Sequence, residues 1–505
     1  MSLLRRSELA VLSVFVLVGA FLRIYRIGEK SLWLDEAMSV WFARHPIIEI
    51  VSVQPASDVH PPLYYLLLGL WIRVFGDGES EVRLLSAFFG VFSIPLLFLI
   101  ANDLFGKTVA LISALVLSLS PFHIYYSQEA RMYTIVTFFV LLSVFFMERI
   151  LFVRKNTRKM VSFYAFGYVI STAIAIYSHN IALLLLMAQV LFLILFFRRY
   201  KTLVWILITS CLFVFVFWLP WLSSFLKQGF SVIKSFYAPP LTLESIVSLF
   251  ATFNNGPHFW LFNWMDIGFL NFFRGKLVTI ALIFFSLLSV KGSFHLVSHI
   301  RPFVFVFLIF LIPLGVEILV SLRYPILAPH TLIWVSVPYY VFVSSGVASM
   351  LPRHRVLFAI SLIFLVFFSL SSAYTYYSGF DKERWDLAAG FVADNSRGDE
   401  LVIFNSSIGQ FPFDYYFKRH GVSLKEMGFP ENYREKKTRV RDLSVLEKIA
   451  HSYDRIWLIY SHEWFTDPKT LTKAALEKSH CVLKEKVFKS KQSDIKCYLF
   501  ERCFR

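Results

Sequence analysis

Two adjacent carboxylates, Asp35 and Glu36, follow the first long apolar segment of the chain. Carboxylates at a membrane surface are costly unless they are solvated, paired or used in chemistry. On a helix their side chains point about 100° apart, so the two cannot share one role. One of them could deprotonate or orient a nucleophile. The alternative is a helix N-terminus capped by Ser31, whose dipole favours acidic residues in the first turn.

A second candidate is His60, within the run Asp58-Val59-His60-Pro61-Pro62-Leu63-Tyr64-Tyr65. The two prolines break any preceding helix and start a new one, which places His60 at a helix start. The backbone N–H groups and the positive end of the dipole there suit an anion such as a phosphate. Asp58 and Tyr65 are further substrate-binding candidates in this run. A helix start with a solvated histidine is the alternative.

Charged and polar groups also occupy two short turns. Glu129 and Arg131 lie in Ser127-Gln128-Glu129-Ala130-Arg131-Met132-Tyr133, so short a turn that both charges must lie at the membrane boundary. Snorkelling or mutual pairing could also explain them. His179 lies in the other turn, where a lone histidine is more often a satisfied interfacial residue than a ligand. Arg323 adds a cation at the outer end of a later span.

The segments that must position these residues are predominantly apolar. Of the 505 residues, 57% are hydrophobic and 17% are charged. Apolar runs of roughly 20 residues, the length that crosses a hydrocarbon core, recur up to about Tyr377. They predict an all-α polytopic membrane bundle of about eleven transmembrane helices, near residues 8–25, 82–101, 108–125, 132–152, 161–178, 181–197, 202–222, 277–291, 302–320, 328–350 and 356–376. No small-residue cleavage site follows the first run, so we expect a retained span and not a signal peptide.

The distribution of basic residues predicts the orientation. The formal net charge of +16 could suggest nucleic-acid binding, but Lys and Arg gather in short clusters between apolar runs, as expected for cytoplasmic loops. We therefore expect no nucleic-acid partner and a multi-pass protein of the cell membrane with a cytoplasmic N-terminus. The first loop (25–81), the turns with Glu129 and His179, and everything after 377 are then extracytoplasmic.

Residues 378–505 alternate helix-like and strand-like pieces, which predicts a small extracytoplasmic α/β domain after a membrane domain of residues 1–377. Its last two strand candidates, 481–488 and 495–503, flank a polar turn. Pairing about the centre of this turn sets Cys481 opposite Cys503. In an oxidising compartment these two cysteines could form a disulfide.

Taken singly these polar groups are weak signals, but the predicted orientation places all of them on one face of the bilayer. Carboxylates for a nucleophile, with Arg and His for a leaving phosphate, are the groups that transfer from a phospholipid-linked donor requires.

These motifs resemble those of the GT-C class of membrane glycosyltransferases, in the branch that holds protein O-mannosyltransferases and the aminoarabinose and galacturonic acid transferases of lipopolysaccharide. Leu34-Asp35-Glu36 resembles the first-loop acidic motif, 58–65 the proline-rich segment, and 127–133 the second-loop motif of bacterial members. The resemblance is best through about residue 190. One departure is His60, because some relatives of the lipopolysaccharide-modifying type have Lys immediately before the paired prolines.

The resemblance implies an inverting hexosyl- or pentosyltransferase that moves a sugar from a polyprenyl-phosphate donor to a lipid, glycan or protein acceptor at the outer face of the membrane. It implies Asp35 as general base or acceptor-orienting carboxylate, Glu36 as a structural or secondary partner, and Glu129 as a second acidic residue near the acceptor or a metal. Arg131, Arg323 and His60 would contact the donor phosphate. No cofactor is specified, although a divalent cation could bind near Asp35, Glu36, Glu129 and His179.

The alternative function is a transporter or flippase of lipid-linked sugars. Transporters place polar groups at mid-membrane on broken helices, whereas the carboxylates here lie in outer loops. Glu317, within the ninth predicted span, is the main exception.

Overall fold

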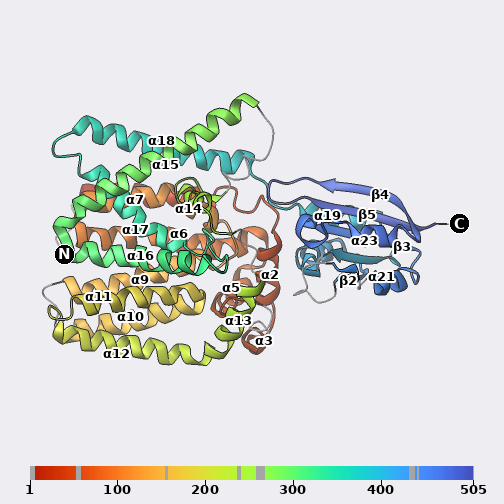
Figure 1. Cartoon of the computed structure of the whole chain (residues 1–505), viewed down its shortest axis with the longest axis horizontal. Coiled ribbons are helices and arrows are strands. Elements are labelled where there is room, and N and C mark those ends of the chain that lie inside the picture. The colour runs from red at the N-terminus through yellow and green to blue at the C-terminus, as the bar shows by residue number, and fades with distance from the viewer. Residues whose placement is uncertain are drawn as a thin grey trace. The chain divides into compact units, whose positions relative to one another are not determined.

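The computed structural model of the chain (Figure 1) describes residues 6–52, 58–153, 157–235, 240–257, 268–405, 407–430, 438–440 and 443–503. The residues divide into two compact units. The membrane unit consists of Met1–Ile27 and Ala43–Ser378, and the C-terminal unit consists of Gly28–Phe42 and Gly379–Arg505. A segment of the first predicted loop therefore packs with the residues that follow the last membrane helix.

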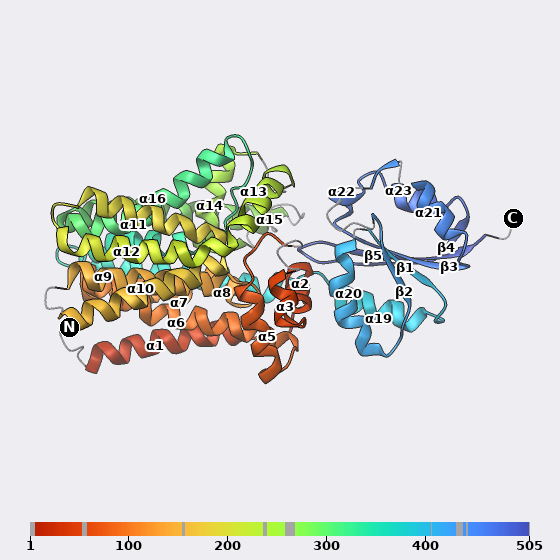
Figure 2. The ribbon, with the colours of Figure 1, turned by 90° about the horizontal axis from the view of Figure 1, so that it is seen from below.

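Long apolar helices that run side by side build the membrane unit (Figures 1 and 2). An α-helix satisfies its backbone hydrogen bonds internally, which is why apolar runs of this length cross membranes as helices. The helices are α1 (Arg6–Ile24), α3 (Ile47–Ser52), α5 (Leu63–Phe75), α6 (Glu79–Phe105), α7 (Lys107–Leu119), α8 (Pro121–Ser127), α9 (Tyr133–Phe152), α10 (Arg158–Ser178), α11 (Leu183–Leu195), α12 (Lys201–Trp218), α13 (Leu222–Ser235), α14 (Leu243–Asn255), α15 (Gly268–Leu296), α16 (Ile300–Ser321), α17 (Ser336–Ala348) and α18 (Arg355–Gly379).

Among the described residues, seven helical stretches are long and apolar enough to cross a membrane, and a bent pair makes up to eight. One of the seven, Val278–Ser321, contains two of the predicted spans. Two further predicted spans fall on shorter apolar helices, Asn180–Leu195 and Ile333–Ala348. The predicted polytopic bundle is confirmed. By length and composition, however, the described residues give fewer membrane-crossing helices than the roughly eleven spans predicted.

The bent pair consists of α7 and α8, which meet at 53° where the sequence predicted a single span. Pro121 starts the second helix, and the hydroxyl of Ser120 caps it. The break leaves carbonyl groups at the end of α7 without helical partners. The buried guanidinium of Arg23 donates to two of them, Leu117 and Ser118, at 2.9 and 3.1 Å. Arg23 thereby ties α1 to the break.

The C-terminal unit contains a five-stranded sheet in the order β2-β1-β3-β5-β4. β2, β1 and β3 are parallel, and β5 and β4 run antiparallel to their neighbours. The strands are β1 (Leu401–Asn405), β2 (Lys425–Gly428), β3 (Arg455–Ser461), β4 (His480–Phe488) and β5 (Ile495–Arg502). The helices are α2 (Leu34–Ala43), α19 (Trp385–Asn395), α20 (Gln410–Phe417), α21 (Leu443–Ala450), α22 (Glu463–Thr466) and α23 (Leu471–Leu476).

Helices cover both faces of this sheet, with α19 and α20 on one face and α21 and α23 on the other (Figure 2). Every residue of β1 and β3 is buried as a result. The predicted small α/β domain is confirmed. The short edge strand β2 was not predicted, because Lys-Glu-Met-Gly lacks the β-branched and aromatic residues typical of strands.

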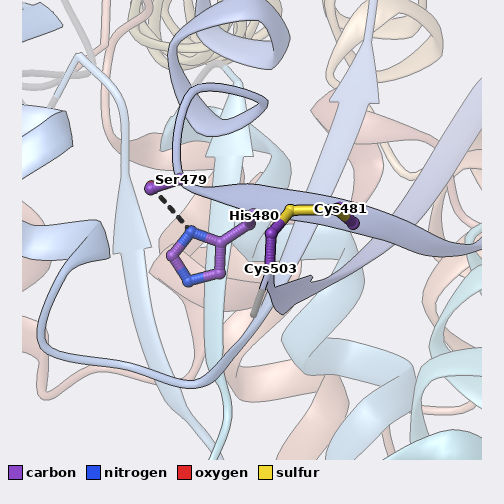
Figure 3. The surroundings of a disulfide bond; sticks show 4 residues. All are labelled: Ser479, His480, Cys481 and Cys503. Carbon is purple, nitrogen blue, oxygen red and sulfur yellow. Dashed lines mark hydrogen bonds between the residues drawn. A yellow bond between two sulfur atoms is a disulfide. The ribbon is translucent and has the colours of Figure 1, made fainter. Parts of the chain in front are cut away.

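Cys481 and Cys503 form a disulfide, with their Cα atoms 5.4 Å apart (Figure 3). The predicted register was wrong in detail, because Cys481 pairs with Glu501 in the sheet. The pairing is irregular between Val482 and Lys484, and an extra residue on one strand shifts every pair beyond it. Cys503 lies just past the end of β5, and the bond ties it to the start of the edge strand β4.

Candidate functional site

His60 lies in the loop that leads into α5, as the two prolines predicted. Hydrogen bonds of the neighbouring Asp58 hold this loop in place. The carboxylate of Asp58 accepts hydrogen bonds from the hydroxyl of Tyr65 and, at 2.7 Å, from the backbone amide of Val59. Asp58 and Tyr65, both predicted to bind substrate, therefore bind each other and stabilise the turn that presents His60.

Two other helical segments of the membrane unit fix the same turn. The side-chain amide of Gln228, in α13, donates to the backbone carbonyl of Asp58 at 2.9 Å. The amide of Asn180, just after α10, donates to the carbonyl of Val59 at 3.1 Å. Because both segments contribute a hydrogen bond, the turn with His60 is fixed by the folded bundle as well as by its own sequence.

His179 is the second histidine of this region, and only 5% of its surface is exposed. Its imidazole ring lies 5.1 Å from that of His60, and its Nδ1 atom accepts the backbone amide of Ile181 at 3.3 Å. These two candidate site residues, which the sequence placed in separate outer loops, therefore lie side by side within the membrane unit.

His330 is a third histidine that the sequence prediction missed. It lies between α16 and α17, and its ring is 5.3 Å from that of Tyr133 and 6.4 Å from that of Tyr126. The ring of Tyr133 lies in turn 6.3 Å from that of His179. The sequence held one signal for His330: it lies next to a proline, Pro329, as His60 lies next to Pro61.

Glu317, the charged exception in the predicted ninth span, supports the segment that carries His330. Its carboxylate accepts the hydroxyl of Thr331 at 2.8 Å, and its side chain is 1% exposed. One turn further along α16, the hydroxyl of Ser321 accepts the backbone amide of Ile326 at 3.3 Å. Glu317 thus orders a loop at the end of the span.

Arg131 lies among the three histidines. Its side chain is 2% exposed, and its guanidinium lies 6.0 Å from the ring centre of Tyr133. The hydroxyl of Ser86, in α6, donates to its backbone carbonyl at 3.0 Å. We call His60, His179, His330 and Arg131 the histidine–arginine cluster.

Electrostatics couple the members of this cluster. Burial lowers the pKa of His60 and of His179 well below 6.5 and that of His330 to about 4, and the charge of Arg131 adds to the effect on all three. These shifts favour the neutral imidazoles at pH 7. A bound phosphate would favour their protonated forms, because an adjacent negative charge stabilises an imidazolium.

Glu129 precedes the cluster in the same turn and is 1% exposed, with its carboxylate next to the hydroxyl of Tyr125. With Arg131 also buried, snorkelling to the interface is excluded as the explanation of this turn. The neighbouring Gln128 is structural: its amide donates to carbonyl groups at the end of α1, and it accepts the hydroxyl of Tyr376 at 2.9 Å.

Arg323 behaves differently from the other predicted phosphate ligands. Its side chain is exposed, and its guanidinium lies 5.6 Å from the ring centre of Tyr324. Within the described chain, no recorded contact joins Arg323 to the histidine–arginine cluster.

In the C-terminal unit, the helix α2 begins at Leu34, so Ser31 does not cap it. The hydroxyl of Ser31 instead donates to the carbonyl of Leu32 at 3.4 Å. Glu36, the third residue of the helix, accepts the backbone amide of Trp33, the residue before the helix, at 3.5 Å. A glutamate three residues into a helix commonly reaches back in this way.

The two adjacent carboxylates have different surroundings, as the offset of about 100° between neighbouring helical residues predicted. Glu36 is fully buried and accepts a hydrogen bond of 2.9 Å from Lys382, which is also fully buried. Asp35 is partly exposed, and the hydroxyl of Ser39 donates to its backbone carbonyl at 2.8 Å. Asp35 is therefore the more exposed carboxylate of the pair.

The described residues contain no group of three or more His, Cys, Asp or Glu side chains placed to hold a metal ion. We therefore assign no ligands to the divalent cation that the sequence left open.

Comparison with known proteins gives two kinds of match. Residues 59–223, which include the cluster residues His60, Arg131 and His179, match the family model for dolichyl-phosphate-mannose-protein mannosyltransferase. An uncharacterized protein of Aquifex aeolicus (strain VF5) is 29% identical over 189 residues, which are 36% of this chain and 37% of that protein. The match thus spans little more than a third of the length of that relative.

Solved structures match nearly the whole chain. ArnT from Cupriavidus metallidurans in the apo state has a TM-score of 0.65 at 12% identity, with 97% of this chain and 98% of ArnT covered. The same protein bound to undecaprenyl phosphate has a TM-score of 0.60 at the same identity, with 96% and 97% covered. The archaeal oligosaccharyltransferase AglB from Archaeoglobus fulgidus, in complex with an inhibitory peptide and a dolichol-phosphate, has a TM-score of 0.58 at 12% identity, with 97% and 74% covered.

At these identities the structural matches show the fold alone, which this chain shares with ArnT and AglB. The predicted resemblance is confirmed, and family match and fold together support a membrane glycosyltransferase.

Proposed function

We propose that this protein transfers a sugar from a polyprenyl-phosphate donor to an acceptor at the outer face of the membrane, with inversion of the anomeric centre. The histidine–arginine cluster is the observation that carries the proposal. It combines a buried guanidinium with three imidazoles at one end of an apolar helical bundle. A lipid phosphate has the matching chemistry, a charged head on an apolar chain.

The structural neighbours support this donor class. ArnT binds undecaprenyl phosphate and AglB binds a dolichol-phosphate in their respective structures. In the proposed reaction the leaving phosphate gains negative charge as the sugar departs. Arg131 would stabilise this charge with charge-assisted hydrogen bonds, and His60, His179 and His330 would add proton-donating groups.

We propose Asp35 as the general base. The hydroxyl of the acceptor gives its proton to the Asp35 carboxylate while its oxygen forms a bond to the anomeric carbon. The bond from that carbon to the phosphate oxygen breaks, and its electron pair leaves with the lipid phosphate. A single displacement of this kind inverts the anomeric centre. Glu36 is assigned a structural role because its carboxylate is buried and paired with Lys382.

The proposed roles of Glu129 and Arg323 rest on the sequence motifs that contain them. Glu129 is buried in the turn that ends at Arg131, and we propose that it acts near the acceptor. Arg323 is exposed on the segment between α16 and α17, and we propose that it attracts the anionic donor before it binds.

The proposed orientation places the N-terminus in the cytoplasm and the C-terminal unit outside. The Cys481–Cys503 disulfide supports it, because disulfides persist in oxidising, extracytoplasmic compartments. The clustering of basic residues in the opposite set of loops supports it independently.

The test compares cell-envelope glycolipids and glycoproteins by mass spectrometry in cells with the wild-type gene, without the gene, and with Arg131→Met. We expect one class of glycosylated molecule to disappear in the last two strains, which would also identify the sugar and the acceptor. Loss of this class together with lipid-linked sugar retained on the inner leaflet would instead indicate a transporter, and unchanged glycosylation would contradict both functions.

A further inference from the structure

The C-terminal unit holds the N-terminus of α2 through two consecutive buried residues, Lys382 and Glu383. The ammonium of Lys382 donates to the carboxylate of Glu36 at 2.9 Å, and both side chains are fully buried. Breaking a buried pair of this kind is strongly destabilising, because one charge is left without a partner in a low-dielectric environment.

Glu383 is also fully buried and completes the attachment. Its carboxylate accepts the indole N–H of Trp385 at 2.6 Å and lies 3.3 Å from the imidazole of His462. The backbone amide of Leu34, at the start of α2, lies near the Glu383 carboxylate and favours its charged form. The first amides of a helix have no intrahelical partners, so a carboxylate from a distant part of the chain suits this end of α2.

Asp35 follows Leu34 directly and is close enough to Glu383 for their charges to interact. Burial raises the pKa of the Glu383 carboxyl, and the negative charge of Asp35 adds to this effect. His462 opposes it, because an imidazolium next to Glu383 favours the carboxylate. Asp35 therefore lies directly beside the residues that hold its helix.

Further contacts attach the same first-loop segment. The backbone amide of Leu32 donates to the hydroxyl of Tyr416, in α20, at 2.7 Å. The ring of Trp41 lies 5.0 Å from that of Phe411. The ammonium of Lys30 donates to the carbonyl of Phe380.

We propose that the C-terminal unit is the positioning element of the reaction, in which Lys382 and Glu383 hold α2 so that Asp35 has its working geometry. The inference rests on the proposed function of Asp35. It differs from a role for this unit in acceptor selection alone, because an acceptor-binding domain would not need buried charges at the base of the Asp35 helix. Lys382 and Glu383 are positioning residues that act through α2.

The first test replaces Lys382 with Met in the full-length protein and measures sugar transfer. We expect kcat to fall about 100-fold, the effect typical of a small misplacement of a catalytic group, with the KM for the donor unchanged. Hydrogen exchange of residues 31–43 should become faster in the same variant. Arg384→Ala is the matched control, since the neighbouring Arg384 forms a half-exposed pair with Asp386.

A second variant guards against simple misfolding. Glu36→Gln combined with Lys382→Met removes both charges, so no buried charge is left unpaired, and the introduced glutamine side chain retains an acceptor for the amide of Trp33. We expect this double variant to fold as stably as the wild type but to keep a reduced kcat, because the attachment of α2 through Lys382 and Glu36 is still missing. Glu383→Gln should retain far more activity than Glu383→Leu, because only the amide can still accept from Trp385.

The outcomes separate this inference from the proposed function. Wild-type protein without transferase activity would contradict the proposed function itself. An active wild type with full kcat in Lys382→Met would overturn the positioning role, as would a change confined to the KM for the acceptor. A double variant that folds as stably as the wild type and has full kcat would overturn it too.

Discussion

The imidazole rings of His60 and His179 lie 5.1 Å apart, although one precedes α5 and the other follows α10. Helices α5 and α10 bring them together beside Arg131, whose charge lowers the pKa of both rings. Because a bound anion would favour the protonated imidazoles, we expect the cluster to bind a phosphate in a pH-dependent manner.

The first prediction concerns Arg131→Lys. A lysine keeps the charge but lacks the bidentate geometry of the guanidinium toward a phosphate. We expect the KM for the lipid-phosphate donor to rise about 10- to 100-fold, corresponding to the loss of a charge-assisted hydrogen bond. Arg73→Lys, at an exposed position of α5, is the control and should leave the KM unchanged. An unaltered KM in Arg131→Lys would remove Arg131 from the phosphate site.

The second prediction concerns pH. The pKa of His330 is lowered to about 4, and a bound phosphate would raise it. At pH values between the pKa of the free imidazole and the higher pKa of the phosphate-bound imidazole, binding takes up a proton. Affinity for the donor should therefore increase as pH falls from about 8 toward about 6. In His330→Asn this dependence should weaken, measured as the KM for the donor at each pH. A pH dependence identical to that of the wild type would exclude a role for His330.

The third prediction concerns Asp35→Asn, which keeps the shape of the side chain and removes its basic group. We expect kcat to fall about 100- to 10,000-fold, the usual contribution of a general base, with expression and membrane insertion retained. Glu49→Gln, at an exposed carboxylate of α3, should be fully active. Near-normal turnover of Asp35→Asn would require another base.

The fourth prediction tests orientation by labelling single introduced cysteines in whole cells with an impermeant reagent. In a Cys211→Ala background, Ser52→Cys should react and Lys159→Cys should not, because the exposed end of α3 and the exposed start of α10 are assigned to opposite faces of the membrane. The remaining native cysteines should be silent, since Cys497 is buried and the other two are bonded. Labelling of Lys159→Cys alone would invert the proposed topology.

The fifth prediction concerns the disulfide. Replacing Cys481 and Cys503 together by Ser should destabilise the C-terminal unit by about 3 kcal/mol in the chain-entropy model, given the 22-residue separation. Faster hydrogen exchange in β4 and β5 should report the change. Exchange that is unaltered by the double substitution would show that the strand pairing alone holds this edge.

The sequence alone determined the kind of protein and most of its elements. Apolar runs of membrane-spanning length predict helices because the bilayer leaves the backbone few alternatives, and proline pairs such as Pro61-Pro62 mark a helix start by local sterics. The motifs around Asp35, His60 and Arg131 also pointed to the GT-C class before any fold was known. These features are local or compositional, so each can be predicted without its partners in space.

Only the tertiary structure decided which residues meet. The approach of His330 to Tyr133 depends on the packing of α9 against Ile333–Val335, just after His330, and no spacing in the chain encodes it. The two halves of the Asp35–Glu36 pair were distinguished by Lys382, which lies far away in sequence but donates to Glu36 in the fold. Long-range contacts of this kind depend on how side chains from distant segments pack closely against each other. The local pattern of residues along the sequence does not specify that packing.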